Sequence, residues 1–410
     1  MKILFLHNNF PAQFRHVAAA FAKAGHEAVF LSAYRKNEEI EGVKHMLISR
    51  PNPKITEDAV ANVYLERLDY GRIAADSMLK LRGEGFVPDI VYSHPGWGCA
   101  HYVPDIFPKA LNAGYFEWYY GTDACKGYFA PPEPDRVFSS DAENRQRNMC
   151  ILDALQSCHV GICPTQWQKS RHPKEYLHKL HVMHDGIDVE FFSPRPTTLH
   201  LPDNTELKSG DEVLTYATRG LEPYRGFPAF YTALPRILEE RPDCHVIIMA
   251  DDRVCYGTPR SDGKTWKTYM RETVPLPEQA DRRVHFLPFS SYNEYRGVLR
   301  VSAVHVYLTV PFVLSWSLTE AMSCGCLLVA SDTETVREAI QHGREGILTD
   351  MRNTDRLAGD IIEALSRRAE LVHMRQNARR TAVERFALHR LLPRHMALLT
   401  GARRMLDSEQ

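Results

Sequence analysis

Residues 304–331 read VHVYLTVPFVLSWSLTEAMSCGCLLVAS, and this stretch decides the fold of the 410-residue chain. The apolar run at 304–308 predicts a buried strand, a helix begins at residues 315–317, and residues 327–330 predict the next strand. A helix that begins just after a strand directs unpaired N–H groups and a partial positive charge at a ligand, most often a phosphate. The pattern therefore predicts half of an α/β nucleotide site, with Glu320 in the first turn of the helix.

The composition is typical of a globular chain that forms two domains. With 44% hydrophobic and 25% charged residues, the chain has material for two domains of roughly 200 residues each. The apolar run at the start is too short for a signal peptide or a membrane span. We therefore expect a cytoplasmic location.

The nine cysteines and the charge narrow the classes of partner. Cysteines such as Cys163 and Cys326 lie in or beside apolar runs without paired metal-ligand spacing, so we interpret them as reduced core residues. The formal net charge of −1 gives no steering toward nucleic acid. The last fifty residues hold ten arginines against five acids, which predicts either solvated terminal helices or peripheral contact with an anionic membrane.

Strands and helices alternate along the whole chain, which predicts an α/β fold with parallel sheets. A polar stretch with few large apolar residues marks a linker near the middle. The first half contains about six apolar runs that predict strands, at residues 3–6, 28–31, 90–92, 115–118, 160–163 and 180–183. The expected organisation is a first domain over 1–193, a linker over 194–210, a second domain over 211–385 and terminal helices over 386–410.

Residues 304–331 resemble the donor-binding segment of family 4 glycosyltransferases, which are retaining enzymes with the GT-B fold. Members usually carry two glutamates in this segment. Glu320 matches the second, which binds the donor ribose in the family, whereas Phe312 replaces the first, which lies beside the transferred sugar. The sequence of residues 307–322 resembles that of one bacterial subgroup of these transferases, in which the first glutamate is replaced. The resemblance implies two Rossmann-like domains facing a central cleft, with the C-terminal helices crossing back to the first domain.

The sequence RGLEPYRG at residues 219–226 follows the strand that opens the second domain. It resembles the family's pair of cations on either side of a Pro-containing loop. Two guanidinium groups can clamp both phosphates of a leaving diphosphate, and preorganised charge of this kind is often the largest catalytic term. We therefore expect Arg219 and Arg225 to act in catalysis, although isolated arginines are most often solvated surface residues.

The second domain is expected to bind the donor. The expected donor-binding residues are Arg219, Arg225, Ser315, Trp316, Ser317, Glu320 and Tyr256. Ser317 and Glu320 also have the spacing of a capping box, which would serve any helix. Because Phe312 cannot hydrogen-bond to a sugar, we expect its ring to pack beneath the donor loop while the backbone amides of 315–317 hold the sugar.

The first domain is expected to hold the acceptor. Glu117 aligns with a position where most family members have a histidine, and a carboxylate there can polarise the acceptor hydroxyl or stabilise positive charge on the sugar. A structural salt bridge is the alternative for Glu117, and packing of the first helix is the alternative for Phe10. The expected acceptor-binding residues are Asn9, Phe10, His94, Tyr119 and Asp123.

We interpret the chain as a retaining, metal-independent glycosyltransferase, because neither an Asp-x-Asp motif nor a His/Cys cluster stands in the context of a metal site. The expected donor is a UDP- or GDP-sugar that serves as substrate, with no further cofactor. The expected acceptor is a glycan, a lipid-linked molecule or a small molecule. The alternatives are a nucleotide-sugar epimerase or phosphorylase on the same fold, and a catalytically weakened nucleotide-sugar-binding partner protein, which the Phe312 replacement would explain.

Overall fold

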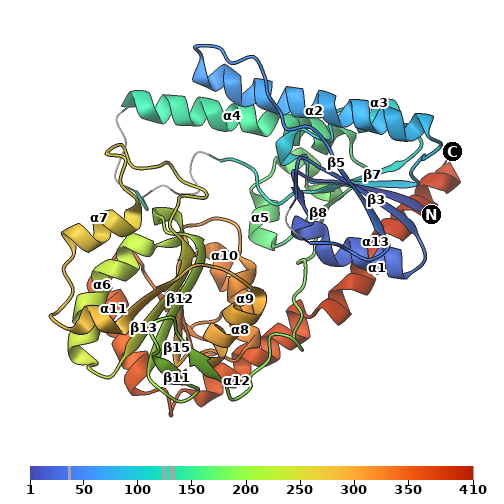
Figure 1. Cartoon of the computed structure of the whole chain (residues 1–410). Coiled ribbons are helices and arrows are strands. Elements are labelled where there is room, and N and C mark those ends of the chain that lie inside the picture. The colour runs from blue at the N-terminus through green and yellow to red at the C-terminus, as the bar shows by residue number, and fades with distance from the viewer. Residues whose placement is uncertain (36–37, 122–124, 126, 130–133, 410) are drawn as a thin grey trace. The chain divides into compact units, whose positions relative to one another are not determined.

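The polypeptide forms two α/β units (Figure 1). The computed structural model describes residues 1–35, 38–121, 125, 127–129 and 134–409, except for the side chains of 134–139 and 409. The first unit takes the described residues up to Gly186 and those from Leu388 onward, and the second takes Ile187–Ala387 with a short segment at 125–129. The chain enters the main part of the second unit at 186–187 and leaves it at 387–388, and these two passages run side by side, since Ile187 and Ala387 form a parallel bridge.

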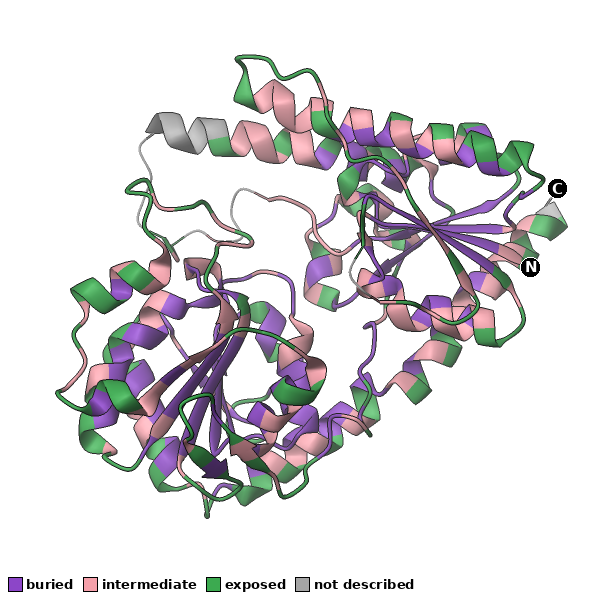
Figure 2. Cartoon of the chain, in the orientation of Figure 1, coloured by how far each residue is buried: buried purple, intermediate pink, exposed green. Residues whose placement is uncertain are grey.

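The first unit contains a sheet of seven strands in the order β5-β3-β1-β6-β7-β8-β9, and every neighbouring pair is parallel. The central strands are buried on both faces, as a sheet covered by helices requires (Figure 2). The strands are β1 (Lys2–Leu6), β3 (Glu27–Ser32), β5 (Val43–Leu47), β6 (Ile90–Ser93), β7 (Leu111–Tyr115), β8 (Val160–Cys163) and β9 (Leu180–Val182), and a small pair is formed by β2 (Asn9–Phe10) and β4 (Tyr34–Arg35).

Helices cover this sheet, and the last of them comes from the end of the chain. The helix α13 contacts both α1 and β7 (Figure 1), and Leu399 on α13 is fully buried in the core beneath them. The C-terminal helix therefore completes the core of the first unit. The helices are α1 (Arg15–Lys23), α2 (Ala59–Gly83), α3 (Val103–Ile106), α4 (Pro134–Ser157), α5 (Gln166–Ser170) and α13 (Leu388–Glu409).

The second unit contains a six-stranded sheet in the order β14-β13-β12-β15-β16-β17, again with parallel neighbours throughout. Its strands are β12 (Val213–Gly220), β13 (His245–Asp251), β14 (Val284–Leu287), β15 (Val304–Tyr307), β16 (Leu328–Ser331) and β17 (Ile347–Thr349). Its helices are α6 (Phe227–Glu240), α7 (Trp266–Thr273), α8 (Tyr292–Val301), α9 (Trp316–Ser323), α10 (Glu334–Arg337), α11 (Thr354–Ser366) and α12 (Val372–Thr381). The α/β prediction with two Rossmann-like sheets is confirmed.

The structure moves the expected domain boundaries. The segment expected as a linker, 194–210, contains a hairpin of β10 (Thr198–His200) and β11 (Glu206–Lys208), and Leu207 is only 2% exposed in the core of the second unit. The passage expected at 193 lies at 186–187, because the Ile187 amide donates to the Phe386 carbonyl at 2.8 Å and the Ile187 side chain joins that core.

Two strands of the first sheet also differ from expectation. The edge strand β5 was not predicted, because its sequence VKHML alternates polar and apolar residues too weakly to stand out. The strand predicted at 115–118 is β7 at Leu111–Tyr115, four residues earlier. A Cβ on Gly114 would lie 2.4 Å from the Phe116 ring and one on Gly161 would lie 2.8 Å from it, so the Phe116 ring covers both glycines at the end of the strand.

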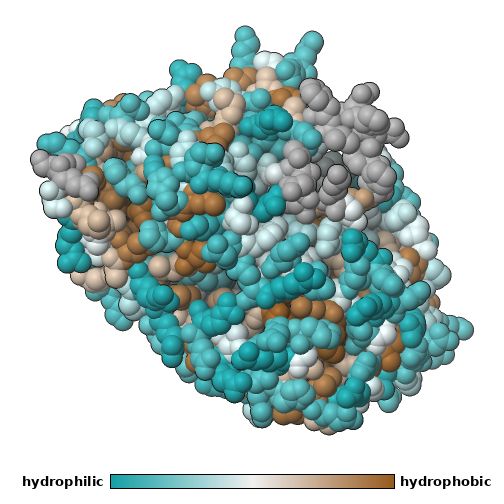
Figure 3. Space-filling view, turned by 180° about the vertical axis from the view of Figure 1, so that it is seen from behind, coloured by the Kyte–Doolittle hydropathy of each residue, from teal (hydrophilic) through white to brown (hydrophobic). Residues whose placement is uncertain are grey.

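The surface has mixed polarity, and the cysteines are reduced, as the composition predicts. Seen from behind, hydrophilic side chains are interspersed with separate hydrophobic patches (Figure 3). All nine cysteines lie within the described ranges and are free thiols, and most of them are buried. Across the helices that the structure describes, none has the length and apolar character needed to span a bilayer.

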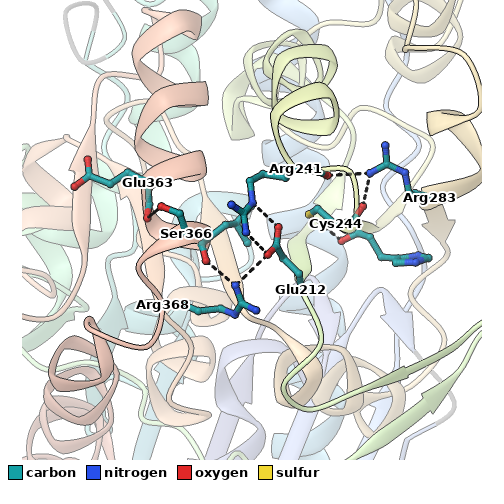
Figure 4. A network of polar contacts seen from close by, with 9 residues as sticks. Glu212, Arg241, Cys244, Arg283, Glu363, Ser366 and Arg368 are labelled. Carbon is teal, nitrogen blue, oxygen red and sulfur yellow. Dashed lines mark hydrogen bonds and ion pairs between the residues drawn. The ribbon is translucent and has the colours of Figure 1, made fainter.

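A buried carboxylate fixes the start of β12 (Figure 4). The Glu212 side chain is 8% exposed and accepts hydrogen bonds from Arg241, at the end of α6, and from Arg368, after α11. Arg283 donates in turn to the carbonyls of Arg241 and Cys244. This network joins the start of β12 to the end of α6 and to the segment after α11, at the amino ends of the strands.

We expect Glu212→Gln to lower the free energy of unfolding by about 2 kcal/mol, because the amide leaves two arginines without their charged partner. Chemical denaturation of the purified chain measures this loss. Glu206→Gln is the matched control, since Glu206 pairs with Lys208 in a solvent-exposed position and should leave stability unchanged. Equal stabilities of the Glu212 and Glu206 variants would contradict the assignment.

Candidate functional site

The residues expected to act on ligands gather where the strand order of each sheet reverses. In the second unit this point lies between β12 and β15, and in the first between β1 and β6. In open parallel sheets, ligands bind outside the carboxyl ends of the strands at this reversal, where successive connections diverge. Each unit therefore has one candidate site, built from the loops that follow these strands.

Arg225 is the anchor of the site in the second unit. It lies in a short turn after β12 and is only 4% exposed. Its Nη1 donates to the Thr309 hydroxyl at 2.8 Å and to the Val313 carbonyl at 3.2 Å. The turn ends at Gly226, whose φ is 67° and where a Cβ would lie 2.5 Å from the Leu308 Cβ, so only glycine fits.

The Tyr307 hydroxyl joins this turn to the start of α9. It accepts hydrogen bonds from Arg225 Nη1 at 3.4 Å and from the Ser315 amide at 3.0 Å. Two residues that were expected to bind the donor, Arg225 and Ser315, are thus brought together from positions 90 apart in the chain. Trp316 and Ser317, in the first turn of the helix, are half-buried beside them.

The cap of α9 differs from expectation. Ser315, and not Ser317, is the capping residue, since its side chain accepts from the Ser317 amide at 3.3 Å. Glu320 is consequently the fifth residue of the helix, beyond the first turn, whereas the acid of a capping box is the third. Its side chain is buried at 6% exposure.

Two aromatic rings lie against the Arg225 guanidinium, and a third packs beside them. The Phe312 ring packs edge-on against Tyr224 and Tyr256, with centroids 5.6 and 5.2 Å apart. The guanidinium lies 5.1 Å from the Tyr256 ring and 5.5 Å from the Phe312 ring, within the range of a cation–π contact. Phe312 therefore packs among the rings of the two neighbouring loops. The amides of Ser315 and Ser317, which were expected to hold the sugar, already donate to the Tyr307 hydroxyl and to the Ser315 side chain. Tyr256, 36% exposed, keeps part of its ring open to solvent.

Arg219 has a different environment from Arg225. It is exposed at the end of β12, and among the described residues its side chain has no hydrogen bond or ion pair. The two arginines therefore differ in how far their side chains are fixed by the protein. Arg225 is fixed within the protein, while Arg219 is available to an anion from solution.

The first unit gathers a polar cluster at its own reversal point. Glu117, just after β7, accepts a hydrogen bond from Gln13 at 2.9 Å and lies 3.3 Å from Nε2 of His94, just after β6. The His94 ring meets the ring of His7, at the end of β1, with centroids 4.9 Å apart. Sequence reasoning named Glu117 and His94 but missed His7 and Gln13. The available signal was that His7 directly follows the first strand and that Gln13 lies in the connection from it to the first helix.

The imidazole of His7 stays neutral in this cluster. Burial, followed by the neighbouring His94, holds the pKa of His7 well below its usual range. Its Nδ1 accepts a hydrogen bond from the Asn9 amide at 2.8 Å, which fixes the turn after β1. Glu117 remains accessible, with 27% of its side chain exposed, so a carboxylate oriented by two polar groups faces solvent.

The other residues expected to bind the acceptor are buried or half-buried, except for one that lies outside the described residues. Phe10 is a correction: its ring is 1% exposed and stacks on His45 at 4.1 Å, so it packs in the core and does not line a surface. Asn9 and Tyr119 are half-buried, and Tyr119 packs against His172. Asp123 lies outside the described residues. Within the described ranges, no group of three or more His, Cys, Asp or Glu side chains is arranged to hold a metal ion.

Two family models match the chain. The model described as Glycosyl transferase family 4 group matches residues 24–192, and the model described as Glycosyl transferases group 1 matches residues 201–381. Together these matches span most of both α/β units. Among curated proteins, no sequence matches this chain.

Solved structures share the fold at low sequence identity. Sucrose-phosphate synthase from Thermosynechococcus elongatus has a TM-score of 0.71 at 15% identity and is covered over 100% of both chains. HepE from Anabaena in complex with UDP-glucose has a TM-score of 0.69 at 15% identity, over 98% of this chain and 100% of that one. A glycosyltransferase from Rickettsia africae has a TM-score of 0.67 at 14% identity, over 98% of both chains. These likenesses establish the GT-B architecture.

The positions of Ser315 and Glu320 on α9 lead to opposite expectations for two variants. Ser315→Ala should lower the free energy of unfolding by about 1 kcal/mol, because it removes the cap. Glu320→Gln leaves the cap intact, so we expect an unchanged melting temperature with weakened UDP binding, measured by calorimetry. A lower melting temperature with intact nucleotide binding in Glu320→Gln would make Glu320 a structural residue.

Proposed function

The chain is a family 4-like glycosyltransferase of the GT-B fold, and from that premise we propose that it is a retaining enzyme that needs no metal ion. It moves a sugar from a nucleotide diphosphate sugar to an acceptor hydroxyl. UDP-sugars are the first donors to test, because HepE, which shares the fold, was solved with UDP-glucose. We propose that the donor is a substrate and that no further cofactor takes part.

The observation that carries the proposal is the pair of arginines at the carboxyl end of β12. A departing diphosphate gains negative charge as the glycosidic bond breaks, and cations already in place stabilise that charge without reorganisation. Arg225 is held by hydrogen bonds to Thr309 and Val313. Arg219 lies in the same connection after β12, and its side chain is exposed to solvent. The amino terminus of α9, joined to Arg225 through Tyr307, adds partial positive charge through the helix dipole, while its Ser315 and Ser317 amides are already bonded within the protein.

Retention follows in this proposal from attack on the same face as the leaving group. The acceptor oxygen forms its bond to the anomeric carbon as the bond from that carbon to the diphosphate oxygen breaks. The acceptor proton passes to the departing phosphate oxygen, so no protein base is consumed. Glu117, oriented by Gln13 and His94, is proposed to orient the acceptor hydroxyl or stabilise positive charge on the sugar.

The free thiols and the terminal arginines bear on where the enzyme acts. Reduced cysteines fit the proposed cytoplasmic location, since a reducing compartment keeps thiols from forming disulfides. Several terminal arginines are structural: Arg379, for example, donates to the carbonyls of Val189 and Phe192. Arg390 and Arg394 on α13 are exposed and, among the described residues, make no hydrogen bond or ion pair. We propose them as the contact with an anionic membrane surface that carries a lipid-linked acceptor.

Arg219→Ala should reduce turnover of the donor by on the order of a hundredfold, by analogy with the loss of one oxyanion donor. The melting temperature should not change, because the side chain is exposed. The assay measures the release of UDP from a UDP-sugar in the presence of an acceptor. A reaction that contains enzyme but no donor gives the background. Arg225→Ala should lower both turnover and stability, since it also empties a buried site.

Arg253→Ala is the control for the charge at this end of the sheet. Arg253 is also exposed near the end of β13, but it pairs with Asp251 at 3.1 Å. Its loss should leave turnover within about twofold of wild type. Wild-type turnover in Arg219→Ala, or an equal loss in both variants, would exclude a specific diphosphate clamp.

The membrane contact has its own test. Wild-type protein should sediment with vesicles that contain phosphatidylglycerol at low ionic strength and remain in solution with purely phosphatidylcholine vesicles. The double variant Arg390→Ala, Arg394→Ala should lose most of this binding while keeping its turnover of soluble substrates. Absence of wild-type binding to either vesicle would eliminate the contact.

A further inference from the structure

Glu222 is a fully buried carboxylate in the turn between Arg219 and Arg225. It has 0% exposure, and its two oxygens accept hydrogen bonds from three consecutive backbone amides of the loop after β13. The donor amides are those of Cys255 at 3.0 Å, Tyr256 at 3.0 Å and Gly257 at 2.7 Å. Successive amides that point to one spot form a concave anion site, and here the protein fills that site with its own side chain.

The two loops also fit together closely around this carboxylate. A Cβ on Gly220 would lie 2.4 Å from the Arg253 carbonyl oxygen, and a Cβ on Gly257 would lie 3.3 Å from a Glu222 oxygen. A side chain on Gly220 would therefore require a loop to move, whereas a methyl group on Gly257 would push the Glu222 and Tyr224 side chains by a few tenths of an ångström. The position of the loop after β13 is set by the turn after β12.

This arrangement has two consequences for a donor. The amides of 255–257 are already occupied, so they do not bind its phosphates, and that task falls to the arginines. The same hydrogen bonds hold Tyr256, whose ring lies against Arg225 and Phe312 and is 36% exposed. An aromatic ring held in place can stack on a base or a sugar without losing conformational freedom on binding.

We propose that Glu222 is a positioning residue that sets donor affinity through Tyr256 without touching the donor. The proposal rests on the proposed function, because it assigns Tyr256 a donor contact. It predicts that the effect of losing Glu222 depends on the presence of the Tyr256 ring. A residue that only stabilised the fold would not show this dependence.

A double-mutant cycle on the full chain tests the proposal, with UDP and UDP-glucose as probes in titration calorimetry. Glu222→Gln should raise the dissociation constant by about tenfold, the equivalent of one charge-assisted hydrogen bond, while kcat at saturating donor changes by less than about twofold. In the Tyr256→Ala background, the same substitution should change the dissociation constant by less than about twofold. Equal effects in both backgrounds would overturn the proposal.

Two further variants keep the test decisive. Glu212→Gln removes a buried carboxylate from the other end of β12 and should lower stability without changing the dissociation constant. If Glu222→Gln does not fold, Gly257→Ala displaces the same loop more gently and should show the same dependence on Tyr256. Wild-type protein that binds neither probe would overturn the proposed function with UDP donors. Wild-type binding that Glu222→Gln and Gly257→Ala both leave unchanged would overturn only the role of Glu222.

Discussion

The site in the second unit depends on how the buried charge of Arg225 is solvated. A buried cation is costly unless hydrogen bonds and polarisable groups replace its water. Tyr307, Thr309 and the Val313 carbonyl provide those hydrogen bonds, and aromatic rings cover the remaining faces. Because all three acceptors belong to β15 or the loop after it, solvating one charge also holds the ends of β12 and β15 together. The groups that would meet a donor are thereby positioned before it arrives.

A buried carboxylate lies near each end of β12, and the two carboxylates bind different kinds of partner. At its start, Glu212 binds two arginines that come from α6 and the segment after α11. Beyond its end, Glu222 binds backbone amides and forms no ion pair among the described residues. The first arrangement joins elements of the scaffold, and the second shapes a loop. A glutamate thus supports the fold at the amino end of β12, and a second glutamate supports the candidate site beyond its carboxyl end.

Much of this could be predicted from local pattern. The apolar runs at 304–308 and 327–330 gave β15 and β16, and the start of a helix between them gave α9. Arg225 and Ser315 were both expected at the donor site, and the structure brings them together through Tyr307. Other features depend on packing that leaves no local trace. Serines at 315 and 317 are equally good caps in sequence, and nothing in the pattern marks Glu222 as buried. The hairpin within 194–210 was missed because a single leucine on each strand supplies its apolar contacts.

The position of α13 means that the first unit is not continuous in the gene. Its core needs Leu399, which is encoded after the entire second unit. The passages at 186–187 and 387–388 are adjacent in space, and Gly186, with a φ of 87°, packs against Leu388. A fragment that stops at 186 would therefore expose apolar surface, and a late stop codon would damage the amino-terminal half. Joining 186 directly to 388 is the shortest route to a single-unit protein.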